Sequence, residues 1–360
     1  MRIALVCPYS VSIPGGVQGQ VLGLAHSLRA QGYDARVLAP ADGPPPAPFV
    51  TSVGPSTKVS SNGSISPIAP GKDAARRTLE ALRGFRPDVL HLHEPLVPGP
   101  PSAALLGTRI PSVGTFHMAA PRSDTFYRWF GKPASGVAKL ITIRTAVSTD
   151  ARRTAQENLG GTYWVLPNGV DLEPIEQADP YPTIAPTVLF IGRHEPRKGL
   201  GVLLDAWEQL DADAVLWVAS DGPETATLQA RGVGRVEWIG RITDAEKARR
   251  LRAATVFCAP ALHGESFGVV LLEAMAASTT VVASDIPGFR NVARPGVEAM
   301  LVAPGDPGAL ADVLRSVLTD PPRRDELAEA GRRRAEEFSM ARLARRFIPL
   351  YEAAIACTPP

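Results

Sequence analysis

Short apolar, β-branched runs alternate with helix-forming segments along this 360-residue chain, and this alternation constrains its fold more than any other feature. After the first run, the spacing of apolar residues predicts a helix over residues 17–31. Strands separated by helices pair in parallel, and their sheet is then covered on both faces. The strand-like runs of the first half are RIALVCP, DARVLAP, DVLHLH, PSVGTFH, KLITIRTAVS and YWVLP.

A segment rich in Asp, Glu and Pro interrupts this pattern over residues 171–186. We predict that it links two domains, because exposed connections between domains often have this composition. The alternation then resumes with TVLFIGR, LGVLLDAWEQL, AVLWVAS, VEWIG, ATVFCAP, FGVVLLEAMAA, TTVVASD and AMLVAP. The sequence therefore predicts an α/β fold with two doubly wound, Rossmann-like domains, residues 1–170 and 187–340. A terminal helix over 341–360 could pack on the first domain.

The composition is that of an ordinary globular protein. Lys and Arg number 38 against 36 Asp and Glu, and the net charge of +2 gives no support to nucleic-acid binding. Three scattered cysteines indicate a reducing compartment and no disulfide framework. We find neither a signal peptide nor a run of ~20 apolar residues. We therefore expect a cytoplasmic protein, with at most a peripheral contact on the inner face of the membrane.

Ligands of doubly wound folds bind at the carboxyl ends of the strands, where this chain carries its unusual residues. Residues 43–71, rich in Pro, Gly and Ser, predict a long loop or irregular hairpin that can carry binding residues.

The first strand leads into Gly15 and Gly16, a pair that permits a close approach to a diphosphate at a helix start. A plain turn explains the pair equally well. With Gly19, the spacing does not match the G-x-G-x-x-G of dinucleotide dehydrogenases.

Two carboxylates, Glu265 and Glu273, stand eight residues apart across the start of an apolar helix, predicted from about Phe267. Glu265 is expected on the preceding loop and Glu273 two turns into the helix, so that both can line one cleft. The N–H groups of Ser266, Phe267 and Gly268 would favour an anion there. Alternatively, Glu265 complements the helix dipole and Glu273 is solvated. Against this, a carboxylate inside an apolar run usually has a hydrogen-bonding task.

A basic loop, residues 192–199, follows the strand TVLFI. Its Arg193 and Lys198 could clamp a diphosphate and neutralise charge as that group departs. A solvated basic loop is the alternative.

Histidines also gather at strand ends. His91 and His93 share one strand face and His117 closes the strand PSVGTFH. A metal site from these three is conceivable, but no fourth ligand is evident, so we expect none. His117 is interpreted as a substrate contact.

Together, these motifs resemble the retaining GT-B glycosyltransferases with an E-x7-E pair. The set comprises the GGV turn, the T-F-H strand end, P-N-G-V-D over 167–171, G-R-x-x-P-R-K-G, and the two glutamates. Within that group the chain is most similar to bacterial phosphatidylinositol mannosyltransferases that use GDP-mannose, on VCPYSVSIPGGVQ, LHLHEP and CAPALHGESFGVVLLEAMAAS. The resemblance implies two domains facing an interdomain cleft, the first binding the acceptor and the second the nucleotide sugar. It also implies hexose transfer with retention and without a metal.

The resemblance further assigns roles to individual residues. The donor would contact Gly16, Arg193, Lys198, Glu265, Ser266, Phe267, Gly268 and Glu273, with Glu265 on the transferred sugar and Glu273 on the ribose. The acceptor would contact Tyr9, Gln18, Asn62, Ser64 and His117. The catalytic set is His117, Arg193, Lys198 and Glu265. In this family's usual mechanism the donor's own phosphate takes the acceptor proton, so no side chain need be the base.

Two departures from that family concern the acceptor. Those enzymes carry an arginine for the lipid phosphate just after the Asn62-Gly-Ser64 segment, where this chain has Pro67. Met-Ala-Ala follows His117 in place of small hydroxyl residues. The segment from Lys72 to Arg86 carries five cations against two acids. Such a helix could lie on anionic lipid or be a solvated surface helix.

The resemblance thus implies a transferase that moves mannose from GDP-mannose to a lipid or polyol hydroxyl, such as that of phosphatidylinositol or a related glycolipid. The alternatives are a relative that uses a UDP-sugar and a soluble acceptor, a sugar-nucleotide epimerase, and a non-catalytic sugar-nucleotide-binding protein.

Overall fold

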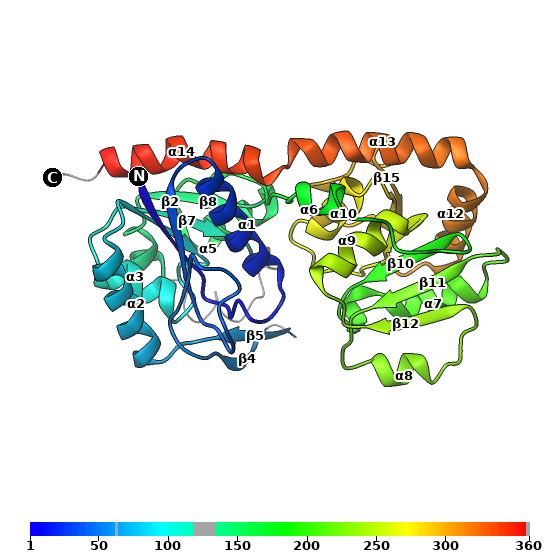
Figure 1. The fold of residues 1–360 in the computed structure, drawn as a ribbon, viewed down its shortest axis with the longest axis horizontal. Coiled ribbons are helices and arrows are strands. Elements are labelled where there is room, and N and C mark those ends of the chain that lie inside the picture. Colours follow the sequence, from blue (N-terminus) through cyan, green and yellow to red (C-terminus); the bar gives the residue numbers. More distant parts are fainter. Residues whose placement is uncertain (62–63, 119–133, 358–360) are drawn as a thin grey trace. The chain divides into compact units, whose positions relative to one another are not determined.

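The structure is a computed structural model that describes residues 1–61, 64–118 and 134–357. Contacts divide the chain into two compact units (Figure 1). The first contains Met1–Gly169 together with Met340–Pro360, and the second contains Val170–Ser339. The C-terminal segment therefore belongs to the same unit as the N-terminus.

The first unit contains a seven-stranded parallel sheet in the order β3-β2-β1-β6-β7-β8-β9. These strands are β1 (Arg2–Val6), β2 (Asp34–Ala39), β3 (Val50–Ser52), β6 (Val89–His93), β7 (Ser112–Phe116), β8 (Ile143–Ala146) and β9 (Trp164–Val165). Alternate residues of β1 enter different core clusters, Ile3 and Leu5 on one side and Ala4 and Val6 on the other. The sheet is therefore covered on both faces, as predicted.

Helices provide that cover. They are α1 (Gly16–Ala30), α2 (Lys72–Phe85), α3 (Pro100–Gly107), α5 (Thr149–Leu159) and α14 (Met340–Ala356). Figure 1 shows α14, in red, beside the blue α1. Leu343, Phe347 and Tyr351 of α14 are buried in the cluster that contains α1 and one face of β1. The terminal helix thus contributes to the core of the first unit.

The Pro/Gly/Ser-rich segment contains more strand than the sequence indicates. β3 adds a parallel strand to the sheet edge beside β2. Strands β4 (Thr57–Ser61) and β5 (Ser64–Ile68) pair with each other as an antiparallel hairpin. The segment is therefore a hairpin preceded by an edge strand.

The second unit contains a six-stranded parallel sheet in the order β12-β11-β10-β13-β14-β15. Its strands are β10 (Thr187–Ile191), β11 (Val215–Ala219), β12 (Val236–Gly240), β13 (Val256–Ala259), β14 (Thr280–Ser284) and β15 (Ala299–Val302). Its helices are α6 (Glu173–Glu176), the 3₁₀ turn η1 (Pro196–Lys198), α7 (Leu200–Glu208), α8 (Thr225–Gln229), α9 (Asp244–Ala253), α10 (Val269–Ala276), α11 (Pro287–Arg290), α12 (Pro307–Thr319) and α13 (Pro321–Glu337). The prediction of two Rossmann-like parallel sheets is confirmed.

The segment predicted as a linker packs on the second unit. Ile175 of α6 is buried in a core cluster of that unit. The Tyr181 ring meets Trp217 edge-on at 5.6 Å, and the guanidinium carbon of Arg250 lies 3.9 Å from the Tyr181 ring centroid. Apolar and aromatic contacts thus hold this acidic, Pro-containing segment against the sheet.

None of the helices in the described stretches is both long and apolar enough to span a membrane.

Candidate active site

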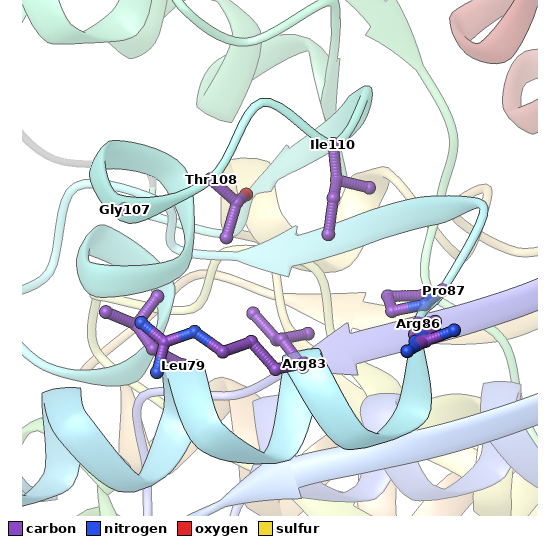
Figure 2. Close-up of a pocket in the computed structure, with 8 residues that line it drawn as sticks. Leu79, Arg83, Arg86, Pro87, Gly107, Thr108 and Ile110 are labelled. Carbon is purple, nitrogen blue, oxygen red and sulfur yellow. The ribbon is translucent and has the colours of Figure 1, made fainter.

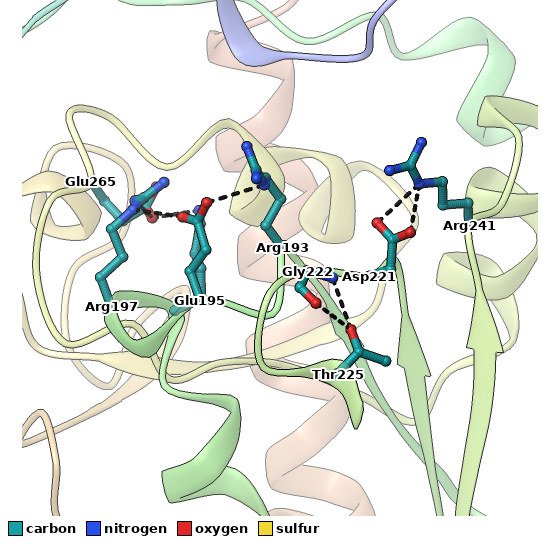
Figure 3. A network of polar contacts seen from close by, with 9 residues as sticks. Arg193, Glu195, Arg197, Asp221, Gly222, Thr225, Arg241 and Glu265 are labelled. Atoms are coloured by element: carbon teal, nitrogen blue, oxygen red, sulfur yellow. Dashed lines mark hydrogen bonds and ion pairs between the residues drawn. The ribbon is translucent and has the colours of Figure 1, made fainter. Parts of the chain in front are cut away.

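The basic loop of the second unit begins where β10 ends, and a buried acid organises it. Glu195 is 7% exposed. Its carboxylate forms an ion pair with Nε of Arg193 at 3.1 Å and accepts a hydrogen bond from Nε of Arg197 at 3.2 Å (Figure 3). Because a buried carboxylate is stable only when it is paired, Glu195 fixes both guanidinium groups. Sequence reasoning did not assign Glu195 a role.

The loop after β13 joins this cluster through Glu265. Nζ of Lys198 donates to Oε1 of Glu265 at 2.6 Å, and a guanidinium nitrogen of Arg197 reaches the same oxygen at 3.3 Å. A backbone hydrogen bond also joins the two loops, because Leu262 N donates to Arg197 O at 2.8 Å. Three cations thus meet two acids, and the arrangement carries a net positive charge. The Arg193 side chain, 44% exposed, is the most accessible of the cations.

Two glycines, one in the loop after β10 and one in α11, allow close backbone approaches to the loop after β13. A β-carbon on Gly199, whose φ is +71°, would lie 1.9 Å from the carbonyl oxygen of Pro260. A β-carbon on Gly288 would lie 1.9 Å from the carbonyl oxygen of Glu265. Neither contact is sterically allowed, so only glycine fits at either position. The positions of Lys198 and Glu265 therefore depend on backbone contacts as well as on their ion pair.

The helix that follows begins later than the sequence indicates. Gly268 has φ +91°, which breaks the helical path, and α10 starts at Val269 instead of near Phe267. Glu273 is consequently one turn into the helix and not two. The Phe267 side chain is buried and meets Phe338 edge-on at 5.7 Å. Only the backbone of Phe267 is therefore available to a donor.

Glu273 is partly buried, with its side chain 21% exposed, and it is paired with a cation. Nζ of Lys247, on α9, donates to its Oε1 at 2.9 Å and also lies 3.1 Å from Asp244. Burial of Lys247 favours its neutral amine, but Glu273 and Asp244 outweigh this and raise the pKa of Lys247. Lys247 therefore remains a cation beside Glu273.

The turn after β11 also supports the basic loop. Nδ1 of the buried His194 lies 2.7 Å from Oγ1 of Thr225, and that hydroxyl also bonds the backbone of Gly222 (Figure 3). A β-carbon on Gly222 would lie 2.6 Å from the His194 backbone. His194 thus connects the loops that follow β10 and β11.

In the first unit, the paired glycines open α1. A β-carbon on Gly16 would meet no atom within 4 Å, so space is open beside this residue. Gln18, expected to contact the acceptor, is buried. Its Nε2 donates to the carbonyl oxygens of Ser10 and Ile13 at 3.3 and 3.2 Å. Gln18 thus holds the loop between β1 and α1.

That loop also bonds the hairpin. Tyr9 forms an antiparallel bridge with Ile68 of β5, and Ser10 N donates to Pro67 O at 2.8 Å. The structure therefore places Tyr9 beside the strand that begins at Ser64. Asn62 lies outside the described residues.

An acid that sequence reasoning missed supports the same loop. Asp42 accepts from the hydroxyls of Ser10 at 2.5 Å and Ser56 at 2.7 Å. The Ser10 hydrogen bond is the main reason that the pKa of Asp42 is lowered. Asp42 thus ties the loop after β1 to the chain before β4.

His117, which follows β7, is held by Glu94. The His117 backbone N–H donates to Oε1 of Glu94 at 2.7 Å. Glu94 is buried and has φ +47°, an unfavourable backbone region for a residue other than glycine. Burial raises the pKa of its carboxyl to about 7, although the backbone bonds from His117 and Met118 oppose this. Within the described ranges, no three His, Cys, Asp or Glu side chains are placed to hold a metal ion.

A pocket of about 600 Å³ lies between α2 and α3 (Figure 2). Leu79, Leu82, Pro87 and Ile110 supply apolar lining. Two exposed arginines, Arg83 and Arg86, add positive charge on the side of α2. The remaining lining residues are Gly107 and Thr108.

Known proteins resemble this chain over nearly its whole length. Two family descriptions match the chain, Glycosyltransferase Family 4 over residues 14–174 and Glycosyl transferases group 1 over residues 185–320. A phosphatidyl-myo-inositol mannosyltransferase of Mycobacterium leprae is 41% identical, over 98% of this chain and 96% of the relative. The chain belongs to the phosphatidyl-myo-inositol mannosyltransferase family. It is therefore a glycosyltransferase, and the predicted resemblance is confirmed.

Other relatives agree with this membership. The protein of the same name from Mycolicibacterium smegmatis is 39% identical over 98% of this chain and 94% of its own. Among solved structures, the sucrose-phosphate synthase of Thermosynechococcus elongatus superposes with a TM-score of 0.77 over 99% of each chain, at 20% identity. At that identity the likeness shows the fold alone, and it agrees with the predicted GT-B fold.

Proposed function

We propose that this glycosyltransferase moves mannose from GDP-mannose to a hydroxyl of phosphatidylinositol or a related inositol lipid, with retention at the anomeric carbon. The observation that carries the proposal is the cluster in which Arg193, Arg197 and Lys198 surround two carboxylates. Its excess positive charge suits a diphosphate, and its partly exposed Glu265 suits a sugar hydroxyl. The names of the near-full-length relatives support the choice of mannose and of the inositol lipid.

In the proposed reaction, the bond between the anomeric carbon and the phosphate oxygen breaks, and the acceptor oxygen bonds to that carbon on the same face. The acceptor proton passes to the departing phosphate. Arg193 and Lys198 stabilise the charge that develops on the diphosphate. Such electrostatic stabilisation is usually the largest single contribution to catalysis. Because these two cations already supply positive charge, we propose that donor binding needs no metal ion.

The first unit would bind the acceptor through Tyr9, Ser64 and His117, with Gln18 acting on the loop that carries Tyr9. Pro67 stands where the family has an arginine for the lipid phosphate, and its carbonyl already accepts from Ser10. We therefore propose that the lipid phosphate is bound less tightly here than in relatives that keep the arginine.

A donor screen tests the first part of the proposal. The full chain is incubated with phosphatidylinositol vesicles and, in turn, GDP-mannose, GDP-glucose, UDP-glucose and UDP-galactose, with and without EDTA. We expect a mannosylated lipid from GDP-mannose alone, unaffected by EDTA, with an α-linkage by NMR. Preferential use of a UDP-sugar, loss of activity with EDTA, or a β-linkage would each overturn the corresponding part.

We also propose that α2 and the adjacent pocket contact the inner face of the membrane. Arg83 and Arg86 border an apolar pocket, and this combination of charge and apolar surface suits an anionic lipid layer. Sedimentation with vesicles of phosphatidylglycerol tests the contact. The double variant Arg83→Glu, Arg86→Glu should bind less than wild type, whereas Arg315→Glu on α12 should bind as wild type does. Equal sedimentation of all three proteins would contradict the proposal.

A further inference from the structure

Three buried histidines form a stacked row in the first unit. His91 and His93 project from β6, and His117 follows the neighbouring β7. The His91 and His93 ring centroids are 4.2 Å apart, and those of His93 and His117 are 5.2 Å apart, each pair inclined by 27°. His93 therefore lies between the other two rings, and its plane is fixed from both sides.

The inner end of the row is fully hydrogen-bonded. Nδ1 of His91 lies 2.7 Å from the hydroxyl of Tyr351, which α14 supplies from the far end of the chain. Nε2 of His91 lies 2.7 Å from Oγ1 of Thr115, and Thr115 continues to Oγ1 of Thr145 at 2.7 Å. Burial lowers the pKa of His91 to about 3, so its ring is neutral. The packed His91 thus forms a rigid support for His93.

The outer contact joins Nδ1 of His93 to Nε2 of His117 at 3.0 Å. Burial lowers the pKa of His117 to about 3 and that of His93 well below its ordinary value, so both rings are neutral. A contact between two neutral imidazole nitrogens holds a single proton, which one ring donates and the other accepts.

The other nitrogen of His93 decides which ring donates. Nε2 of His93 is buried and has no hydrogen-bond partner among the described residues. If His117 donated, the proton of His93 would sit on that Nε2 as a buried N–H without an acceptor. If His93 donates, the unpartnered atom is only a lone pair. Orphaned buried N–H groups are the rarer of the two cases.

We propose that His93 is a positioning residue that donates from Nδ1 to Nε2 of His117 and so holds the proton of His117 on its Nδ1. The consequence for the reaction rests on the proposed function, in which His117 contacts the acceptor. A fixed Nδ1–H would offer that acceptor a hydrogen-bond donor in a single orientation, so no free energy would be needed to select a tautomer in each catalytic cycle.

Nitrogen NMR of the imidazole rings tests the proposal in the full-length protein without substrate. The His117 signals, assigned by their loss in His117→Gln, should show the pattern of the Nδ1–H tautomer. In His93→Phe, which keeps a stacked ring but removes the donor, they should show a mixture of tautomers. His93→Asn, whose side-chain amide can replace the Nδ1–H, should restore the wild-type pattern. Thr145→Val, which alters only the inner end of the row, should leave it unchanged.

Kinetics give a second readout. We expect His93→Phe to lower kcat about tenfold with little change in KM, and His93→Asn to recover most of the loss. An Nε2–H pattern for His117 in the wild type would overturn the proposal, and this spectrum needs no variant to fold. An unchanged His117 tautomer in His93→Phe would overturn it as well. If the tautomer is as expected but no sugar is transferred, the proposed function fails instead.

Discussion

Nζ of Lys198 lies 2.6 Å from Oε1 of Glu265, which bonds a cation of the loop after β10 to an acid of the loop after β13. From the sequence, these residues are two separate donor contacts, one for the diphosphate and one for the sugar. Their pairing means that a change at either residue alters the position and charge of the other. The same oxygen also receives Arg197, so the pair belongs to a larger cluster.

Replacement of Lys198 by Met should lower the turnover number by about 10²–10³-fold, because it removes a cation from the departing diphosphate. Turnover at saturating donor measures the effect. The control is Arg315→Met on α12, whose ion pair with Asp312 is exposed and contributes little. A Lys198→Met enzyme within twofold of wild type would show that this cation does not serve catalysis.

The double variant Lys198→Met, Glu265→Gln should lose less activity than the product of the two single losses. The reason is that each single variant leaves the other member of the pair without its partner, whereas the double variant does not. A double-mutant cycle on kcat/KM measures this coupling. Strictly multiplicative losses would mean that the two side chains act independently on the donor.

Gly288→Ala should destabilise the fold by about 1–3 kcal/mol, because the new methyl group would overlap the Glu265 carbonyl oxygen. Urea unfolding measures this change. Gly201→Ala is the matched control. Gly201 lies in helix α7, and its β-carbon would meet only the Leu228 side chain, at 3.9 Å. The control should be neutral or slightly stabilising. Equal stability of Gly288→Ala and wild type would show that α11 and the loop that carries Glu265 can separate without cost.

Glu94 predicts a specific dependence of stability on pH. Its pKa rises from the ordinary 4.5 to about 7 on folding, so between these values the unfolded chain releases a proton that the folded chain keeps. Stability from this group therefore falls as pH rises from 4.5 to 7, by about 3 kcal/mol, and is constant above that. His91 and His117, with lowered pKa values, act in the opposite direction between pH 3 and 6.5.

The difference between wild type and Glu94→Gln isolates the carboxyl, since glutamine keeps an acceptor for the His117 N–H. The free energy of unfolding of the variant, relative to wild type, should increase steadily from pH 4.5 to 7. Parallel pH profiles for the two proteins would contradict the raised pKa of Glu94.

The fold follows from the sequence because its signals are local. Alternating strand and helix runs place His93, His117 and Arg193 at or just after strand ends without knowledge of distant contacts. The predicted start of α10 was too early by about two residues. The apolar run already begins at Phe267, but the left-handed backbone of Gly268 prevents the helix from starting before Val269.

Contacts between distant residues could not be predicted in the same way. Tyr351 and His91 are 260 residues apart, and only the packing of α14 on the sheet brings them together. Lys247 carries an ordinary surface charge in the sequence, and nothing local marks it as the partner of Glu273. Glu195, in contrast, stands between Arg193 and Arg197 in a strand-end loop, and this position is a local signal that could have identified it.

The most direct test of the proposed function is an assay for the transfer of mannose to an inositol lipid. Purified full-length protein is incubated with GDP-mannose and phosphatidylinositol vesicles, and the lipids are analysed by mass spectrometry beside a Lys198→Met control. We expect a lipid heavier by one hexose in the wild-type reaction and about 10²–10³-fold less of it in the control. Absence of a mannosylated inositol lipid, with mannose transferred instead to a soluble acceptor, would contradict the proposed function.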